Sequence, residues 1–247
     1  MKFTFVFLAL ICIYYSRSAE AQVRHIGGKD VPVIKYPFMA AIAYANQHVG
    51  NGAIINSKWI LTSASAVFFV EEALYYVKVG ADSFTSPGFW YEVFHIYRHP
   101  EFVGWDYNIA LIQLKDNVRY TETVKPIALP GDDPEFFTGK LLSYGQNEHG
   151  TRHLREADYT IVADDRCVNF LTDSSARQMI IDKQGYCLFG HDQGQFYSDA
   201  GAPVVANDQL YGLFAFAEHH GGVNDGSVAT RVFKFTTWIQ EKMTQIG

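Results

Sequence analysis

The sequence has no excess of positive charge, because 20 Lys and Arg stand against 26 Asp and Glu, a net charge of -6. It therefore lacks the polybasic footprint that binding to nucleic acid or an anionic membrane requires. It contains no Asn-x-Ser/Thr acceptor, so N-glycosylation is not expected. Its N-terminal apolar run, Phe3 to Tyr15, has 13 residues and is too short for the ~20-residue helix that spans a bilayer.

The N-terminus instead carries the pattern of a secretory signal peptide. Lys2 gives a basic start, the apolar run follows, and Ala19-Glu20-Ala21 places small residues at the two positions that signal peptidase reads. We expect residues 1–21 to be removed and the protein to be secreted and extracellular. A membrane anchor is the alternative interpretation.

Only three cysteines occur, and Cys12 lies inside this signal. Cys167 and Cys187 remain as an even pair in an oxidising compartment, which favours a disulfide over two free thiols. A bridge that closes a loop of this size contributes on the order of 3 kcal/mol.

Length and composition indicate an ordered domain. The 247 residues fit one large all-β domain or two small ones, with enough chain to bury a full core. Aromatic residues make up 15% of the chain and charged residues 19%, which argues against disorder.

Residues 196–203 read FYSDAGAP and run straight into two valines, which predicts a tight, partly buried turn that feeds a core strand. The stretch resembles the Gly-Asp-Ser-Gly-Gly-Pro nucleophile turn of trypsin-like serine proteases. Asp199, Gly201 and Pro203 match that turn, whereas Ala200 takes the place of the nucleophilic serine. An alanine methyl group can neither attack a carbonyl nor exchange a proton.

Two further segments resemble the same family and carry substitutions at its catalytic positions. Residues 59–66, WILTSASA, are similar to the family's WVLTAAHC, with Ser65 in the place of the catalytic histidine. Residues 107–114, YNIALIQL, are similar to NDIALLKL, with Asn108 in the place of the triad aspartate. The family cysteine after the histidine is Ala66, and its disulfide partner is Gly50, so both ends of one bridge are missing together.

The resemblance covers essentially all of the predicted mature chain and implies an all-β fold. Two six-stranded antiparallel Greek-key barrels would pack together, followed by a C-terminal α-helix. The N-terminal barrel would span about residues 25–130 and the C-terminal barrel about residues 131–247, with 126–130 crossing between them. The resemblance also implies that Cys167 and Cys187 pair with each other.

Residues 25–28, HIGG, resemble the IVGG that opens activated members of the family, after a possible short pro-segment at residues 22–24. Cleavage after Arg24 would free the amino group of His25, which the resemblance implies pairs with Asp199. In an uncut chain the resemblance assigns His48 to Asp199 instead. An exposed Arg24 that nothing cuts is the alternative.

By the same resemblance, the former substrate pocket comprises Gly194, Ser198, Phe216, Ala217 and Ser227. Gly194 stands at the pocket floor, so no acid is present there to bind Arg or Lys. Ser198 replaces a glycine whose N–H helps to bind the oxyanion. Either the cleft still holds an extended peptide through strand-edge hydrogen bonds, or bulky aromatic residues fill it and leave the loops as the binding surface.

No cofactor or metal is expected. The carboxylate that opens a calcium loop in some relatives is replaced by Ala81. The adjacent His219-His220 are interpreted as part of a solvated loop rather than as metal ligands, because neighbouring side chains point apart on an extended chain.

The family's mechanism needs a nucleophile, a base and an orienting acid, and the three positions here are Ala200, Ser65 and Asn108. Removing a triad lowers kcat by about 10⁶. We therefore expect a catalytically inactive secreted homologue that binds an extracellular protein: a protease, a protease substrate or an inhibitor. The alternatives are an active endopeptidase, for example through a relocated Ser198–His48 pair, or a carrier of a small ligand in the reshaped cleft.

Overall fold

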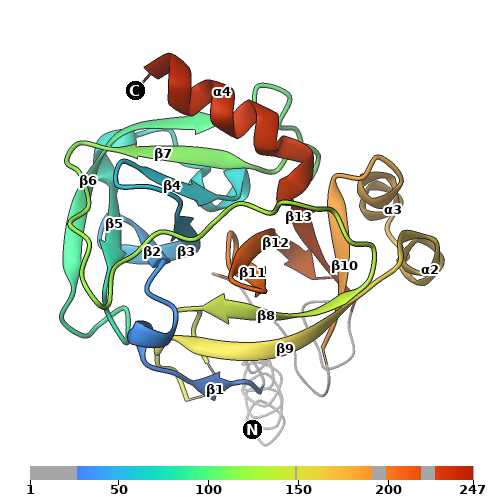
Figure 1. Ribbon diagram of the computed structural model, residues 1–247, viewed down its shortest axis with the longest axis horizontal. Coiled ribbons are helices and arrows are strands. Elements are labelled where there is room, and N and C mark those ends of the chain that lie inside the picture. Colours follow the sequence, from blue (N-terminus) through green and yellow to red (C-terminus); the bar gives the residue numbers. More distant parts are fainter. Residues whose placement is uncertain (1–26, 148, 191–198, 218–225, 247) are drawn as a thin grey trace, which may run out of the picture.

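The computed structural model describes residues 27–147, 149–190, 199–217 and 226–246. These residues form two closed antiparallel β-barrels that lie side by side (Figure 1). Each barrel contains six strands, and a seventh short strand, β1 (Lys29–Asp30), pairs with β9 of the second barrel.

The N-terminal barrel closes in the strand order β2-β3-β4-β7-β6-β5. Its strands are β2 (Met39–Tyr44), β3 (Gln47–Ile54), β4 (Trp59–Thr62), β5 (Tyr75–Val79), β6 (Phe89–Arg98) and β7 (Ala110–Leu114). β-Branched and aromatic residues, which suit a pleated and half-buried surface, are frequent in them. The β2–β3 hairpin turns through Ala45 and Asn46, both at positive φ, as a two-residue hairpin loop requires.

The C-terminal barrel closes in the order β8-β9-β10-β13-β12-β11, with β11 paired back to β8. Its strands are β8 (Phe137–Ser143), β9 (Arg155–Val162), β10 (Gly185–Gly190), β11 (Pro203–Ala206), β12 (Gln209–Ala217) and β13 (Ser227–Arg231). Asn207 and Asp208 form the β11–β12 turn at positive φ, a conformation that these two residue types tolerate.

One cluster of buried apolar residues is shared by the two barrels. It includes Trp59 and Leu111 from the first barrel and Leu142 and Leu213 from the second. The last helix, α4 (Thr236–Ile246), adds the fully buried Ile239 to this cluster. Figure 1 shows α4 lying across the first barrel near β7, although it is the last element of the chain.

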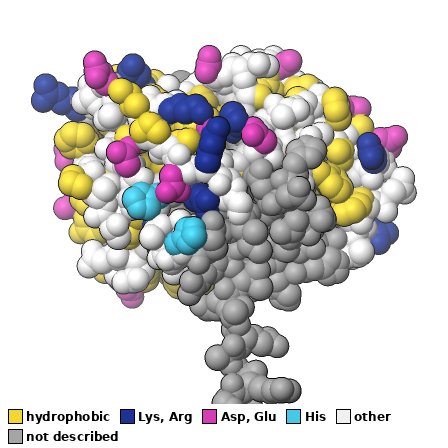
Figure 2. All heavy atoms as spheres, turned by 90° about the horizontal axis from the view of Figure 1, so that it is seen from below, with side chains coloured by type: hydrophobic (Ala, Val, Ile, Leu, Met, Phe, Trp, Pro, Cys, Tyr) yellow, Lys and Arg dark blue, Asp and Glu magenta, His cyan; other side chains and the backbone are white. Residues whose placement is uncertain are grey.

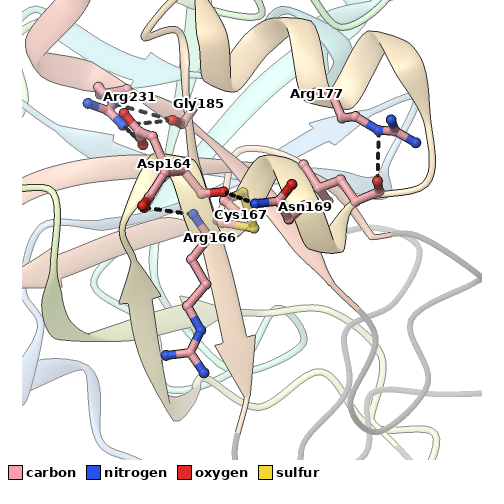
Figure 3. The surroundings of a disulfide bond; sticks show 10 residues. Asp164, Arg166, Cys167, Asn169, Arg177, Gly185 and Arg231 are labelled. Carbon is pink, nitrogen blue, oxygen red and sulfur yellow. Dashed lines mark hydrogen bonds and ion pairs between the residues drawn. A yellow bond between two sulfur atoms is a disulfide. The ribbon is translucent and has the colours of Figure 1, made fainter.

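Two helices lie on the outer side of the C-terminal barrel, α2 (Asp164–Phe170) and α3 (Ser174–Ile181) (Figure 1). The disulfide between Cys167 and Cys187 joins α2 to β10, with the two Cα atoms 5.8 Å apart. Beside it the buried Arg231 of β13 donates hydrogen bonds to Asp164, at the start of α2, and to the carbonyl oxygen of Gly185 (Figure 3). The disulfide and Arg231 thus fix α2 to the barrel from two sides.

The predicted fold class is confirmed, with two closed six-stranded antiparallel barrels and a C-terminal helix, and the Cys167–Cys187 disulfide is present. The crossing segment at 126–130 contacts both barrels, since the Ile127 N–H donates to the Ile54 oxygen and Ala128 bridges to Gln209. The sequence pattern did not predict α3. The predicted signal peptide and pro-segment lie outside the described residues, and within these no helix is long and apolar enough to cross a membrane.

A buried carboxylate ties the N-terminal segment to the second barrel. Glu156 of β9 is 2% exposed and pairs with Lys29 over 2.9 Å and with Lys35 over 2.6 Å. Burial alone would raise the pKa of Glu156, but hydrogen bonds from Lys35, Tyr36 and Lys29 outweigh it and lower the pKa to about 2. Viewed from the side of β1, the surface shows Lys and Arg side chains intermixed with acidic ones (Figure 2).

We expect Glu156→Gln to lower the free energy of unfolding near neutral pH by about 2 kcal/mol, because charge-assisted hydrogen bonds become weaker neutral ones. In the wild type this contribution is complete above the ordinary pKa of 4.5 and is lost as the pH falls toward about 2. Urea unfolding at several pH values in that range checks the prediction.

The matched control is Asp158→Asn, since Asp158 lies on the same strand with its side chain 56% exposed. This control should leave the free energy of unfolding nearly unchanged. A Glu156→Gln protein that keeps the wild-type acid dependence would contradict the assignment.

Candidate functional site

Ser65 and Asn108 form a reciprocal hydrogen-bonded pair in the first barrel. Ser65 lies in the single turn of 3₁₀ helix at Ala64–Val67, directly after β4, and Asn108 precedes β7. The Ser65 N–H donates to Asn108 Oδ1 over 2.8 Å, and Asn108 Nδ2 donates to Ser65 Oγ over 3.1 Å. Asn108 is fully buried, and its carbonyl oxygen accepts a hydrogen bond from Thr230 of the second barrel.

Ala200 lies in a tight turn that meets the first barrel. The Ala202 N–H donates to the Asp199 oxygen over 2.8 Å, and Gly201 between them has φ of 74°. A Cβ on Gly201 would lie 2.3 Å from the Asn51 oxygen and 2.3 Å from Thr62 Oγ1, so only glycine fits. The Ala200 oxygen accepts a hydrogen bond from the Asn51 N–H over 2.8 Å.

The three positions that the resemblance assigns to the triad therefore meet at the junction of the barrels. Ala200 packs against the apolar cluster that contains Ala64 and Ala66, the two neighbours of Ser65. Alanine, serine and asparagine side chains have no group that ionises near neutral pH. Together these three side chains can accept and donate hydrogen bonds. They do not supply a nucleophile paired with a base, and they carry no charge that would orient a base.

Gly50 and Ala66 face each other, as the paired loss of one family disulfide implies. A Cβ on Gly50 would lie 2.7 Å from the Cβ of Ala66 and 2.9 Å from the Ala200 oxygen. The space of the missing bridge is thus closed by direct packing of small residues against the turn.

Asp199 is fully buried at the start of this turn. Its Oδ1 accepts a short hydrogen bond from the Ser143 hydroxyl, and Ser143 Oγ accepts in turn from the Gly145 N–H over 2.7 Å. A Cβ on Gly145 would lie 1.9 Å from Asp199 Oδ1, so the end of β8 approaches the carboxylate only because residue 145 is glycine. Asn51 Nδ2 also reaches Ser143 Oγ over 3.2 Å, which connects the network to β3.

His48 of β3 is buried, with 6% of its surface exposed. Its Nδ1 lies 3.1 Å from Arg152 Nη1, and because a guanidinium only donates, Nδ1 accepts and Nε2 carries the hydrogen. Burial and then the Arg152 charge lower the pKa of His48 to about 3, although the Asp199 charge opposes them. Among the described residues the His48 imidazole bonds to Arg152 and Asp199 Oδ1 accepts from Ser143, so the hydrogen bond expected between His48 and Asp199 in an uncut chain is not seen there.

Phe216, Ala217 and Ser227 of the former pocket lie on adjacent strands, with Ala217 of β12 paired to Ser227 of β13. Trp105, from the β6–β7 connection of the first barrel, packs on Phe216 with ring centroids 4.5 Å apart. Four predicted site residues lie outside the described residues, namely Arg24, His25, Gly194 and Ser198.

A tight turn carries Trp105 to this position. Val103 and Asp106 exchange two backbone hydrogen bonds, and Gly104 between them has φ of 61°. The turn therefore presents Trp105 at its tip, across the junction from its own barrel.

Three contributors to the site were missed at the sequence level: Ser143, Arg152 and Trp105. Nothing in the sequence marked the Ser143 hydroxyl as a partner of the buried acid. Arg152 and Trp105 lie in connections between strands, where the sequence carries no periodic signal.

No group of three or more His, Cys, Asp or Glu side chains in the described part of the chain could hold a metal ion. A cavity of about 510 Å³ lies elsewhere, and its lining includes Lys35, Phe38, Ile127 and Lys140 but none of the predicted site residues.

Comparison with known proteins places this geometry in a family. A sequence model of the trypsin family matches residues 25–239. The serine proteinase stubble of Drosophila melanogaster is 27% identical over 249 residues, which cover 90% of this chain and 31% of stubble. Kallikrein 1-related peptidase b16 of Mus musculus is 24% identical over 260 residues, which cover 98% of each chain.

Among solved structures, neuropsin, a serine protease expressed in the limbic system of mouse brain, superimposes with a TM-score of 0.76. The match covers 87% of this chain and 98% of neuropsin at 22% identity, so it shows the shared fold. Because the family model matches most of the chain, from the segment before β1 into α4, the protein belongs to the trypsin family of serine proteases.

Proposed function

We propose that this chain is a secreted member of the trypsin family that has no proteolytic activity and acts by binding another extracellular protein. The observation that carries the proposal is the reciprocal hydrogen bonding of Ser65 and Asn108 beside Ala200. Where the family places a base and an orienting acid, this chain places two neutral side chains that satisfy each other.

Peptide hydrolysis by this family requires a hydroxyl to lose its proton to an imidazole while it attacks the carbonyl carbon. Ala200 has no hydroxyl, and Ser65 cannot accept that proton near neutral pH. Loss of the whole triad lowers kcat by about 10⁶, roughly 8 kcal/mol of barrier. His48 offers no rescue, because its acceptor nitrogen is bonded to Arg152 and its pKa lies near 3.

The former cleft is partly covered by the protein's own side chains. Phe216 and Ala217 of β12 pair with β13 along one edge of their strand. Trp105 packs on Phe216 from the opposite barrel, so two aromatic rings fill part of the space beside this strand. This contact favours the loops over the cleft as the binding surface.

An exposed apolar loop at Phe68, Phe69 and Val70, between β4 and β5, offers such a surface. Phe68 is 71% exposed and Val70 is 89% exposed. The backbone between them is held rigidly, since the Phe69 N–H donates to the Tyr75 hydroxyl over 2.9 Å and Arg98 donates to the Phe69 oxygen over 2.9 Å. A rigid apolar loop binds a partner with little further loss of conformational entropy.

Secretion is supported by the N-terminal signal pattern and by the Cys167–Cys187 disulfide, since such bonds persist in oxidising compartments. The proposed partner is therefore an extracellular protein, namely a protease, a protease substrate or an inhibitor.

A fluorophosphonate serine-hydrolase probe tests the lack of activity. We expect no labelling of the purified chain before or after cleavage at Arg24, because labelling needs an activated serine. Active trypsin in the same reaction is the positive control. Stoichiometric labelling of the wild type would overturn the proposal, and loss of that label in Ser198→Ala or in Ser65→Ala would identify the serine.

The binding surface is tested with Phe68→Ser combined with Val70→Ser. Cross-linking and affinity capture from the native secretion first identify a partner, whose Kd for the purified chain is then measured. We expect the double variant to raise Kd at least about tenfold, since the few residues that cost over 1 kcal/mol on truncation cluster near the centre of an interface.

The matched control is Phe136→Ser, because Phe136 is 66% exposed but lies just before β8 in the second barrel. This control should leave Kd unchanged. An unchanged Kd for the loop variant would place the interface elsewhere.

A further inference from the structure

The loop between β5 and β6 is folded around the side chain of Lys78. This lysine lies near the end of β5 and is buried, with 4% of its surface exposed. Its Nζ donates a hydrogen bond to the Phe84 oxygen over 2.7 Å and a short one to the Ser86 oxygen. A buried ammonium group is destabilising unless other polar groups replace its hydration, so these two carbonyls help to keep it inside.

Two aromatic rings enclose the same ammonium group. The ring centroid of Trp90 lies 5.2 Å from Lys78 Nζ, and that of Phe84 lies 5.9 Å from it. The two rings meet edge to face, with centroids 5.8 Å apart. A cation within about 6 Å of a ring face is attracted by the ring. We call this arrangement the ammonium cage: the carbonyl oxygens of Phe84 and Ser86 with the rings of Phe84 and Trp90.

The loop has hydrogen bonds of its own that set the walls of the cage. The Ser83 N–H donates to Ser86 Oγ over 2.9 Å, and the Ser86 N–H donates to the Ser83 oxygen over 3.2 Å. A Cβ on Gly88 would lie 2.9 Å from Lys78 Cε, so the glycine leaves room for the lysine stem. The turn is thus closed by itself, and Lys78 adds the group on which its carbonyls converge.

The same loop joins the two barrels. The Phe84 N–H donates to the Arg152 oxygen over 2.9 Å, and the Leu154 N–H donates to the Asp82 oxygen over 2.8 Å. Asp82 Oδ1 also accepts from the Val33 N–H over 2.7 Å. Whatever fixes the loop therefore also fixes the connection between β8 and β9 and the segment after β1.

We propose that the ammonium cage is a binding site for a primary ammonium group and that the chain fills it with its own Lys78. The bound ammonium holds the β5–β6 loop in the conformation that bridges the barrels. A neutral alcohol would bring no charge to the rings, and a quaternary ion has no N–H for the carbonyls. The inference concerns this loop and does not depend on the proposed lack of proteolysis.

Burial lowers the pKa of Lys78, as expected for a cation taken out of water. The carbonyl and ring contacts offset that cost, because they are made to the charged form.

Chemical rescue of Lys78→Ala in the full mature chain tests the proposal. We expect this variant to lower Tm by about 6 °C, because it empties the cage and leaves two carbonyls without their donor. Propylammonium chloride, which matches the deleted atoms, should restore at least half of the loss and leave the wild-type Tm unchanged. At equal concentration, 1-propanol and tetramethylammonium chloride should restore none of it.

The matched control is Lys58→Ala, because Lys58 Nζ also donates to a backbone oxygen, that of Lys115 over 2.7 Å, but at an exposed position. Its Tm should change by no more than about 2 °C, and propylammonium should not alter it.

Lys78→Met decides the question if Lys78→Ala does not fold, since methionine keeps an unbranched stem but has no ammonium group. We expect hydrogen exchange at the Phe84 and Leu154 amides to become at least about tenfold faster, with the Ile54 amide of the first barrel unchanged.

Four results would overturn the proposal. They are an unchanged Tm in Lys78→Ala, equal or absent rescue by all three solutes, wild-type exchange rates in Lys78→Met, and failure of both variants to fold. The last counts against it because loss of an ammonium that holds one loop should leave the barrels intact.

Discussion

The burial of the Asp199 carboxylate at the junction of the two barrels is the constraint on which the site depends. The carboxylate can be buried only if the backbone comes close to it from both sides. Glycines, which have no side chain, allow this approach. Gly145 admits the end of β8 to within contact of the carboxylate, and Gly201 lets the turn fit against Asn51 and Thr62. Water cannot reach a carboxylate that is packed this closely. The same few residues around Asp199 must therefore provide both the close packing and the groups that stabilise its charge.

Ser65, Asn108 and Ala200 carry no group that ionises near neutral pH, and they are held in an ordered arrangement. A catalytic centre keeps reactive side chains in partly unsatisfied arrangements, which lowers stability in exchange for activity. Here Ser65 and Asn108 satisfy each other, and Gly50 and Ala66 pack directly where the family has a disulfide. This satisfied arrangement agrees with the proposal that the protein binds rather than cleaves.

The sequence carried enough information to predict both barrels, because short apolar strands in a fixed order matched known family segments. It also located Ser65, Asn108 and Ala200, which depend only on local motifs. It could not predict the contact between His48 and Arg152, which are 104 positions apart and meet only when the barrels close. The pairing expected between His48 and Asp199 followed from analogy with the family alone. In the structure the His48 imidazole faces Arg152, which no sequence motif identifies.

The position of α4 has a consequence for the order in which the chain can fold during synthesis. The first barrel leaves the ribosome first, but Trp59 and Tyr97 of that barrel belong to a cluster completed by Ile239, Trp238 and Met243. Those residues lie in the 11-residue helix α4, which is synthesised after the strands of both barrels. The nascent first barrel therefore keeps part of an apolar surface uncovered until α4 has been made, and transiently exposed apolar surface of this kind is prone to aggregate.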